Sequence, residues 1–272
     1  MTEKILLDAG PSPRGWHRLQ LFLECPQRFA FRHRDGEKVR DDSHPSPPLA
    51  TGSLIHVGLA HHYARMQARQ QGRDPDAYYE PTDAVAALVM AKGEGWAPFM
   101  ATAQHAVEAY IAQYLSEKRT ILHVEEVFEA DFGGNLLTAR VDLVFEDARG
   151  KVWFEDHKTT GRIDAKQPLF YAVSGQVLAY RWIGQAVYGE RFGGVSLNMV
   201  QTDGTKFARP GLDPAPALMA RFPRVVVETE ARIAALDAEG RACEDWPRSP
   251  TELVCYHRYG ACDFIERCKW GA

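Results

Sequence analysis

The sequence predicts an α/β protein in which a mixed central β-sheet is flanked by helices. In the first half of the 272-residue chain, apolar residues recur mainly at helical spacing. Between residues 121 and 155 the apolar period changes to two, which is typical of strands. A helical segment, an apolar strand and a second helical segment follow, and this order indicates a sheet covered by helices. Beside this core we expect a helical N-terminal insertion and a C-terminal tail stapled through cysteines.

The first half is expected to consist of helices and one loop. Residues 16–34 carry apolar side chains on both sides of Cys25-Pro26, so we expect two short helices around a proline turn. Residues 43–48 hold three prolines and two serines, which predicts a loop. Helical spacing returns over Gly52–Gln70 and is repeated over Val85–Glu117.

Three consecutive strands are predicted next, at 124–129, 136–145 and 151–155. Gly133-Gly134-Asn135 marks the first turn between them, and the polar residues 146–150 mark the second. A helix over about 169–187, a strand over 194–200 and a long helix over about 214–236 complete the pattern. We divide the chain into an N-terminal helical segment (1–50), a helical insertion (51–120), a core (121–240) and a cysteine-rich tail (241–272).

Composition excludes several classes of protein. Charged residues make up 25% of the chain, and no run of about 18 apolar residues occurs, so we expect a cytoplasmic protein without a membrane span. A formal charge of −4 argues against a protein that coats nucleic acid by bulk electrostatics. A local basic groove remains possible between Arg14 and Arg40. Its members are Arg18, Arg28, Arg32, Arg34 and Lys38, and the alternative for them is a solvated helix face.

Two carboxylates lie in or at the end of apolar strands, Asp142 and Asp156. An isolated buried charge is costly unless it is paired or coordinates a metal. Positions i and i+2 of a strand point to the same face, so Lys158 projects beside Asp156 while His157 points away. Two acids suit Mg²⁺ or Mn²⁺, which polarise a phosphate and lower the pKa of water. Lys158 would orient that water or stabilise charge on phosphorus.

This arrangement resembles the PD-(D/E)XK phosphodiesterases, and more narrowly their RecB-like branch, with its restriction-endonuclease-like core. The resemblance rests on the Asp142 strand, the hairpin and Asp156-X-Lys158. It also rests on the early helix Gly52-Ser53-Leu54-Ile55-His56 and on Gln176 and Tyr180, four residues apart on the helix that follows. The short Asp-X-Lys motif is weak alone, and the order of all these elements supplies the specificity.

The resemblance implies a role for each of these residues. His56, Asp142, Asp156 and the main-chain carbonyl of His157 would bind the metal, and Lys158 would assist the nucleophilic water. Gln176 and Tyr180 would line the active site near the DNA backbone, and Arg28 and Arg32 are further candidates for DNA contact.

Each candidate has a structural alternative. Asp156 and Lys158 would form a salt bridge, His56 would be a hydrogen-bonded core histidine, and Tyr180 would serve packing alone. His61 and His62 are nearby alternatives to His56, which we prefer because it follows Gly52. We prefer Asp156 over Glu155, since Glu155 points to the opposite face. The chain also departs from many relatives by having Ala139-Arg140 where they have a glycine.

Four of the five cysteines resemble the set that holds an iron-sulfur cluster in several RecB-like nucleases: Cys25, Cys255, Cys262 and Cys268. Six residues separate Cys255 from Cys262, more than the two found in the bacterial recombination enzymes. Four thiolates bind a 4Fe-4S cluster or a zinc ion, and ligand identity does not separate these. The alternative is four reduced cysteines that pack as small apolar groups. Cys243 is given no role.

The resemblance implies a metal-dependent DNA nuclease, in particular an exonuclease that acts on ends or single strands in recombination, repair or phage replication. Its partners would be DNA and a recombination or CRISPR protein. Two alternatives stay open: a catalytically inactive module of the same fold that binds DNA or recruits partners, and a CRISPR-associated nuclease that processes spacers.

Overall fold

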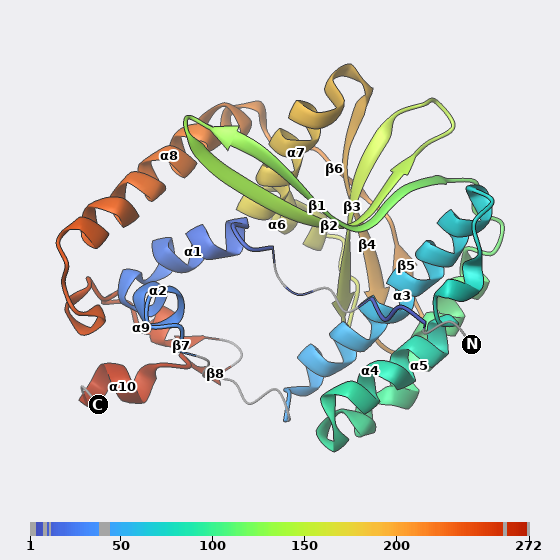
Figure 1. Cartoon of the computed structure of the whole chain (residues 1–272), viewed down its shortest axis with the longest axis horizontal. Coiled ribbons are helices and arrows are strands. Elements are labelled where there is room, and N and C mark those ends of the chain that lie inside the picture. Colours follow the sequence, from blue (N-terminus) through green and yellow to red (C-terminus); the bar gives the residue numbers. More distant parts are fainter. Residues whose placement is uncertain (1–3, 8–9, 11, 38–43, 258–259, 271–272) are drawn as a thin grey trace.

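The computed structural model describes residues 4–7, 10, 12–37, 44–257 and 260–270. Its centre is a mixed β-sheet (Figure 1), and the strands of the described chain that form it are β1 (Thr120–Phe132), β2 (Asn135–Glu146), β3 (Val152–Thr160), β4 (Phe192–Gln201), β5 (Phe207–Ala208) and β6 (Gly211–Leu212). The strand order is β1-β2-β3-β4-β5, and β6 also pairs with β4. Strands β1, β2 and β3 are antiparallel neighbours, whereas β3 and β4 are parallel. The predicted fold class is therefore confirmed.

The tight turns of the sheet form where glycine and polar residues predict them. Gly133 and Gly134 adopt φ values of 62° and 86°, the left-handed conformation that two-residue hairpin turns favour. In the second turn, Asp147 Oδ1 accepts hydrogen bonds from the backbone N–H groups of Arg149 and Lys151 at 2.9 and 3.0 Å. These turns align β1, β2 and β3 as consecutive antiparallel strands.

Helices cover both faces of the sheet. Their bounds are α1 (Trp16–Glu24), α2 (Pro26–His33), α3 (Pro47–Gln70), α4 (Pro81–Lys92), α5 (Met100–Gln113), α6 (Gln167–Ala172), α7 (Gly175–Tyr188) and α8 (Pro216–Ala238). The two helices predicted around Cys25-Pro26 are α1 and α2. In Figure 1, α3, α4 and α5 lie together on one side of the sheet, and α7 and α8 lie on the other.

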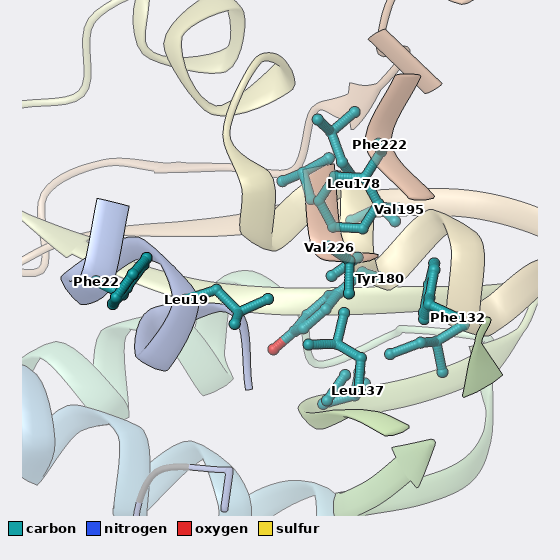
Figure 2. Packing of buried hydrophobic residues seen from close by; sticks show 14 of the residues in the cluster. Leu19, Phe22, Phe132, Leu137, Leu178, Tyr180, Val195, Phe222 and Val226 are labelled. Atoms are coloured by element: carbon teal, nitrogen blue, oxygen red, sulfur yellow. The ribbon is translucent and has the colours of Figure 1, made fainter. Parts of the chain in front are cut away.

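Each face of the sheet carries its own apolar core because strand side chains alternate. On the α3–α5 side the core includes Leu143 and Phe145. On the other side, Val144 and Phe154 pack with residues of α1, α2, α7 and α8. Figure 2 shows this second core, in which Tyr180 of α7 lies among apolar side chains.

Three sequence-based boundaries need correction. The predicted helix over 85–117 is divided into α4 and α5 by the 3-10 segment η2 (Glu94–Phe99), after Gly93 ends α4 with a φ of 100°. The helix over 169–187 is divided into α6 and α7, and Ser174 caps α7 by accepting a hydrogen bond from Val177 N. The predicted loop over 43–48 ends early, because α3 begins at Pro47, a residue type favoured in the first helical turn.

The C-terminal tail packs on α2. It contains η4 (Cys243–Asp245), α9 (Glu252–Cys255), β7 (Tyr256–His257), β8 (Gly260–Ala261) and α10 (Ile265–Trp270). Gln27 N donates a hydrogen bond to the Pro247 carbonyl at 3.0 Å, and the rings of Phe31 and Phe264 lie 5.5 Å apart. Short 3-10 turns also occur at η1 (Pro75–Ala77) and η3 (Gly189–Arg191). Among the helices that the structure describes, none is long and apolar enough to cross a membrane.

Candidate active site

A cleft of about 560 Å³ lies at the junction of the sheet with α1, α3 and α7. The sequence-predicted residues that line it are His56, Asp142, Asp156, Lys158, Gln176 and Tyr180. They come from α3, β2, β3 and α7, so segments more than one hundred residues apart in the chain meet here. Trp16 and His17 of α1 form part of the cleft wall.

The two carboxylates come from adjacent strands. Leu143 pairs with Glu155 in the register of β2 and β3, so the next position along brings Asp142 opposite Asp156. The His157 N–H donates to Asp142 Oδ2 at 2.6 Å. Burial, and then the negative charge of Asp156, raise the pKa of Asp142 to about 7. Two acids held this close are electrostatically unfavourable, and a divalent cation between them would relieve the repulsion.

Lys158 lies on the same face of β3 as Asp156, as strand alternation predicts. Its Nζ is 2.5 Å from Asp156 Oδ2. Burial lowers the pKa of Lys158, but the charge of Asp156 and the contact between them outweigh burial, so the pKa lies above its usual value. The side chain is therefore an ammonium held beside the acids.

Gln176 forms hydrogen bonds with both Asp156 and Lys158. Its Nε2 donates to Asp156 Oδ1 at 2.9 Å, and its Oε1 accepts from Lys158 Nζ at 3.2 Å. Gln176 Nε2 also lies 3.3 Å from Tyr180 OH, and the Tyr180 hydroxyl donates to the Arg140 carbonyl. Gln176 and Tyr180 thus connect α7 to both strands that carry the acids.

His56 approaches the acids from α3. Its Nδ1 lies 3.8 Å from Asp142 Oδ2. Burial in the cleft and the charge of Lys158 lower the pKa of His56 to about 4, which leaves the imidazole neutral, as a metal ligand must be. Gly52, one turn earlier, allows α3 to approach β3 closely, since a Cβ there would lie 2.8 Å from Thr159 Oγ1.

The two alternative histidines lie elsewhere. His61 is buried, and its Nε2 accepts a hydrogen bond from Leu7 N at 3.0 Å. The His62 ring packs against Tyr63 at 4.9 Å. Neither histidine lines the cleft, whereas His56 does.

The donors in the cleft match the chemistry of a divalent cation but are not gathered around one point. Carboxylate oxygens and a neutral imidazole suit Mg²⁺ or Mn²⁺, and the buried Asp156 Oδ2 has the Lys158 ammonium as its one polar partner among the described residues. Within the same part of the chain, no three His, Cys, Asp or Glu side chains are close enough to hold a metal ion. A cation would have to draw His56, Asp142 and Asp156 together.

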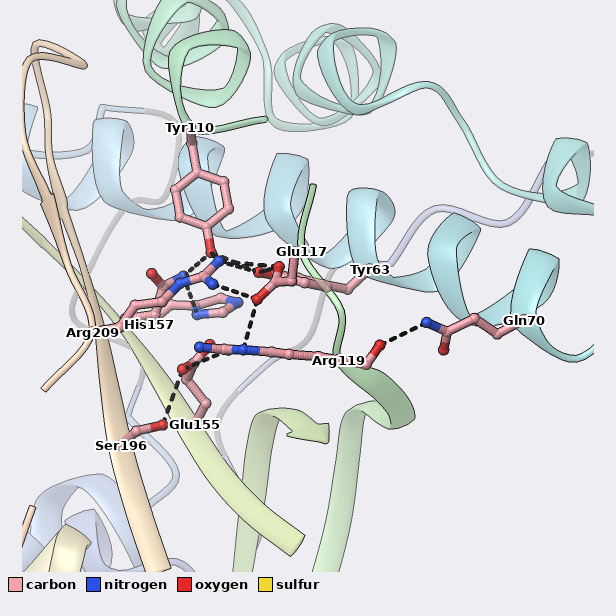
Figure 3. Close-up of polar contacts among 10 residues, drawn as sticks. Tyr63, Gln70, Tyr110, Glu117, Arg119, Glu155, His157, Ser196 and Arg209 are labelled. Atoms are coloured by element: carbon pink, nitrogen blue, oxygen red, sulfur yellow. Dashed lines mark hydrogen bonds and ion pairs between the residues drawn. The ribbon is translucent and has the colours of Figure 1, made fainter. Parts of the chain in front are cut away.

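Glu155 and His157 point to the opposite face of β3 and belong to a buried polar network (Figure 3). Glu155 pairs with Arg119 at 2.8 Å and accepts a hydrogen bond from Ser196 Oγ at 3.0 Å. The His157 ring stacks on Tyr63, with ring centroids 6.0 Å apart, and its Nδ1 lies 3.0 Å from Asn198 Nδ2. Only the backbone of His157 is therefore turned toward Asp142.

Sequence reasoning missed the partners of Glu155 and the position of Glu125. Arg119 lies 36 positions from Glu155, and no local pattern links them. Val124 pairs with Leu143 and Glu126 with Val141, so Glu125 lies across from Asp142 and lines the cleft. Glu125 has a φ of 53°, the only positive value at a non-glycine residue in the described chain. The one sequence signal for Glu125 is that it and Glu126 are adjacent acids in a predicted strand.

The predicted basic cluster is largely neutralised. Ion pairs join Arg18 to Glu230 at 2.6 Å, Arg28 to Glu24 at 3.6 Å, and Arg34 to Asp237. Arg32 is exposed and has no ion pair within the described ranges, and Lys38 lies outside them. Neither Arg28 nor Arg32 lines the cleft. Arg32 and Arg34 are exposed, whereas Arg18 and Arg28 are half-buried in their ion pairs.

The four cysteines of the predicted cluster lie around the contact between α2 and the tail. Cys25 Sγ accepts a hydrogen bond from Ser249 N at 3.5 Å, and Cys268 Sγ donates to Gln27 Oε1 at 3.1 Å. A contact with Cys268, together with charges on Cys268, Cys255 and Cys25, raises the pKa of Arg248. Cys262 N donates to the Cys255 carbonyl at 2.7 Å. In the described residues the thiols are not gathered as a formed metal site.

Comparisons with known proteins agree with this fold. A candidate exonuclease from Eubacterium rectale has a solved structure that matches with a TM-score of 0.52 at 13% identity, over 90% of this chain and 88% of that chain. At this identity the likeness shows the fold alone. The structure of SSO0001 matches at 16% identity over 64% of this chain and 74% of that chain. Its TM-score of 0.32 is too low to show a shared fold. No curated protein matches significantly.

The profile of the PD-(D/E)XK nuclease superfamily matches residues 16–269. This match spans nearly the whole chain and includes the cleft residues described above. The protein belongs to the PD-(D/E)XK nuclease superfamily.

Proposed function

We propose that the protein is a divalent-metal-dependent deoxyribonuclease of the RecB-like branch, and that it acts as an exonuclease on DNA ends or single strands. Recombination, repair and phage replication are the settings that this branch implies. The observation that supports the proposal most is the convergence of Asp142, Asp156 and Lys158 in one cleft of a nuclease fold.

The cleft residues divide the work of hydrolysis. Asp142, Asp156, His56 and the His157 carbonyl would hold Mg²⁺ or Mn²⁺, which lowers the pKa of water and polarises a phosphate. Lys158, a charged amine beside Asp156, would orient the attacking water and stabilise charge that develops on the phosphate oxygens. Gln176 and Tyr180 are positioning residues, because Gln176 bonds to both Asp156 and Lys158.

One digestion tests this proposal. End-labelled linear DNA and circular DNA, each single- and double-stranded, are incubated with the protein and Mg²⁺ or Mn²⁺. Asp156→Ala should abolish cleavage because it removes a ligand and the partner of Lys158, while circular dichroism should report an intact fold. Degradation of linear but not circular DNA would identify an exonuclease.

Asp83→Ala is the matched control, since Asp83 is an exposed acid on α4, outside the cleft. It should cleave at the wild-type rate. Full activity of Asp156→Ala, or no metal-dependent cleavage by the wild-type protein, would overturn the proposal.

We also propose that Cys25, Cys255, Cys262 and Cys268 hold a 4Fe-4S cluster, with zinc as the alternative. The position of Cys25 and Cys268 where α2 contacts the tail supports this assignment. Either group would fasten the tail to α2 and so close a loop that spans most of the chain.

A further inference from the structure

The short helix α6 exposes a patch of large apolar side chains beside the active site. Leu169, Phe170 and Val173, here called the α6 patch, are 71%, 70% and 60% exposed. Val173, at the C-cap of α6, lies three positions after Phe170 and four after Leu169, so it is a neighbour of both on the helix surface. Three large apolar side chains exposed within five positions form an apolar surface patch. Such patches mark binding sites for other molecules.

The α6 patch is connected to the catalytic amine by two ring contacts. The ring centroids of Phe170 and Tyr171 lie 5.5 Å apart in an edge-to-face arrangement. Lys158 Nζ in turn lies 5.6 Å from the centroid of the Tyr171 ring. Gln167 Nε2 donates to Thr160 Oγ1 at 3.2 Å, which holds the start of α6 against the end of β3. The α6 patch therefore lies two ring contacts away from Lys158.

The charges around the patch suit a phosphate backbone. Arg162 and Lys166 precede α6, are exposed, and form no ion pair within the described ranges. The acid between them, Asp164, accepts a hydrogen bond from Lys166 N at 2.7 Å within its own turn. The surface thus combines cations with an exposed aromatic ring, the combination that binds single-stranded nucleic acid.

We propose that the α6 patch is a stacking platform for unpaired bases of the DNA strand that is being cut. The inference rests on the proposed nuclease function and names its substrate as single-stranded. Phe170 offers its ring to a base, and Leu169 and Val173 cover the neighbouring base edges. Bases within a duplex are already paired and stacked, so they cannot use the platform without being separated.

Phe170→Ala tests the platform through substrate binding. Stacking on one aromatic side chain contributes about 1–3 kcal/mol, so the KM for a single-stranded oligonucleotide should rise roughly 5- to 160-fold. The kcat should change little, because Phe170 does not touch the acids. Phe170→Trp should keep the wild-type KM. Met90→Ala is the matched control, since Met90 on α4 is 85% exposed and lies outside the cleft.

An oligonucleotide with a run of abasic nucleotides supplies the second arm. The wild-type protein should bind it at least as weakly as Phe170→Ala binds the intact strand, and Phe170→Ala should lose less affinity than the wild-type protein when the intact strand is replaced by the abasic one. Fluorescence anisotropy without added metal measures the same binding, so the platform is tested even where the wild-type protein cuts no DNA. That last result would overturn the nuclease function alone.

Equal affinities of the wild-type protein and Phe170→Ala for the intact strand would overturn the platform. So would an equal loss of affinity for intact and abasic strands. Sedimentation in which Phe170→Ala dissociates a wild-type dimer would also overturn it, because the patch would then be a contact between copies of this chain.

Discussion

Gln176 shows how one amide organises the cleft. It donates to Asp156 and accepts from Lys158, so it fixes the acid and the amine relative to each other. Gln176→Ala should lower kcat by roughly 10- to 100-fold, because small misplacement of reacting groups costs about this much. The KM should change less than about threefold. Steady-state cleavage of a labelled oligonucleotide measures both.

Gln185→Ala is the control for this substitution. Gln185 lies on the same helix and is exposed, and its side chain donates to the Gly189 carbonyl at the helix end. A kcat for Gln176→Ala equal to that of Gln185→Ala would remove the positioning role of Gln176.

Glu155 is a fully buried acid that forms an ion pair with Arg119. The free energy of unfolding of the protein should therefore depend on Arg119. Burial raises the pKa of Glu155 although Arg119 opposes the shift. Arg119→Met removes the larger of two counter-charges, Arg209 being the other, and should destabilise the protein by about 3–5 kcal/mol at neutral pH. Because the folded state then binds the Glu155 proton more tightly than the unfolded state, stability should fall as pH rises and recover toward acid.

Urea unfolding between pH 5 and pH 8 measures the difference between Arg119→Met and the wild-type protein. The difference should shrink as the pH falls, because the raised pKa of Glu155 lets the folded variant bind a proton. The double variant Arg119→Met/Glu155→Gln should recover much of the loss. A deficit that is the same at every pH, and that persists in the double variant, would contradict the dependence of Glu155 on Arg119.

At the scale of elements, Gly175 sets the contact between α1 and α7. A Cβ at this position would lie 1.9 Å from the Trp16 ring, a rigid group on the cleft wall. Gly175→Ala should therefore force the two helices apart and cost about 1–3 kcal/mol of stability. Gln176 is the next residue, so kcat should fall as well. Thermal unfolding and cleavage rates together test both effects.

Gly161→Ala is the matched control, because a Cβ at Gly161 would meet no atom within 4 Å. Its melting temperature and its rate should stay close to wild type. If Gly175→Ala behaved in the same way, the close approach of α1 and α7 would not constrain the site.

The strands could be predicted from the sequence more fully than the helices. A period of two identifies β1, β2 and β3, and glycine or polar turns mark their ends, because these signals are local. The breaks before η2 and α7 were missed, since helical spacing of apolar residues continues across Gly93 and Ser174. Whether a helix stops at such a residue depends on capping and on what the next segment contacts.

At the scale of the whole molecule, the cleft is assembled from segments that the motif order already identified. Alternation predicted that Asp156 and Lys158 share a face, and the structure agrees. The contacts of Glu125 could not be predicted, because its position depends on the register between β1 and β2 and on an unusual φ. The assigned roles of the cleft residues, and the four-part division of the chain, stay predictions.

The tail gives a prediction at this scale. Anaerobically purified protein should be brown and contain about four irons per chain if a 4Fe-4S cluster is present. Cys25→Ser and Cys262→Ser should lose the colour and loosen the tail, which limited proteolysis would detect. Cys243→Ser should keep the colour and the resistance of the tail to proteolysis. Burial and Asp35 raise the pKa of the Cys243 thiol to about 11, which disfavours the thiolate that a ligand requires.

Colourless protein with one zinc per chain would replace the cluster with a zinc staple. Two results together would show that the four cysteines serve packing alone. The wild-type protein would contain neither metal, and the tail of Cys25→Ser would be as resistant to proteolysis as that of Cys243→Ser.

Anomalous diffraction from crystals soaked in Mn²⁺ would locate the catalytic metal. We expect a manganese peak between Asp142 and Asp156, at roughly 2.0–2.3 Å from an oxygen of each carboxylate, and no such peak in Asp156→Ala. A wild-type crystal with Lys158 still paired to Asp156 and no manganese between the two acids, at a concentration that supports DNA cleavage, would contradict this expectation.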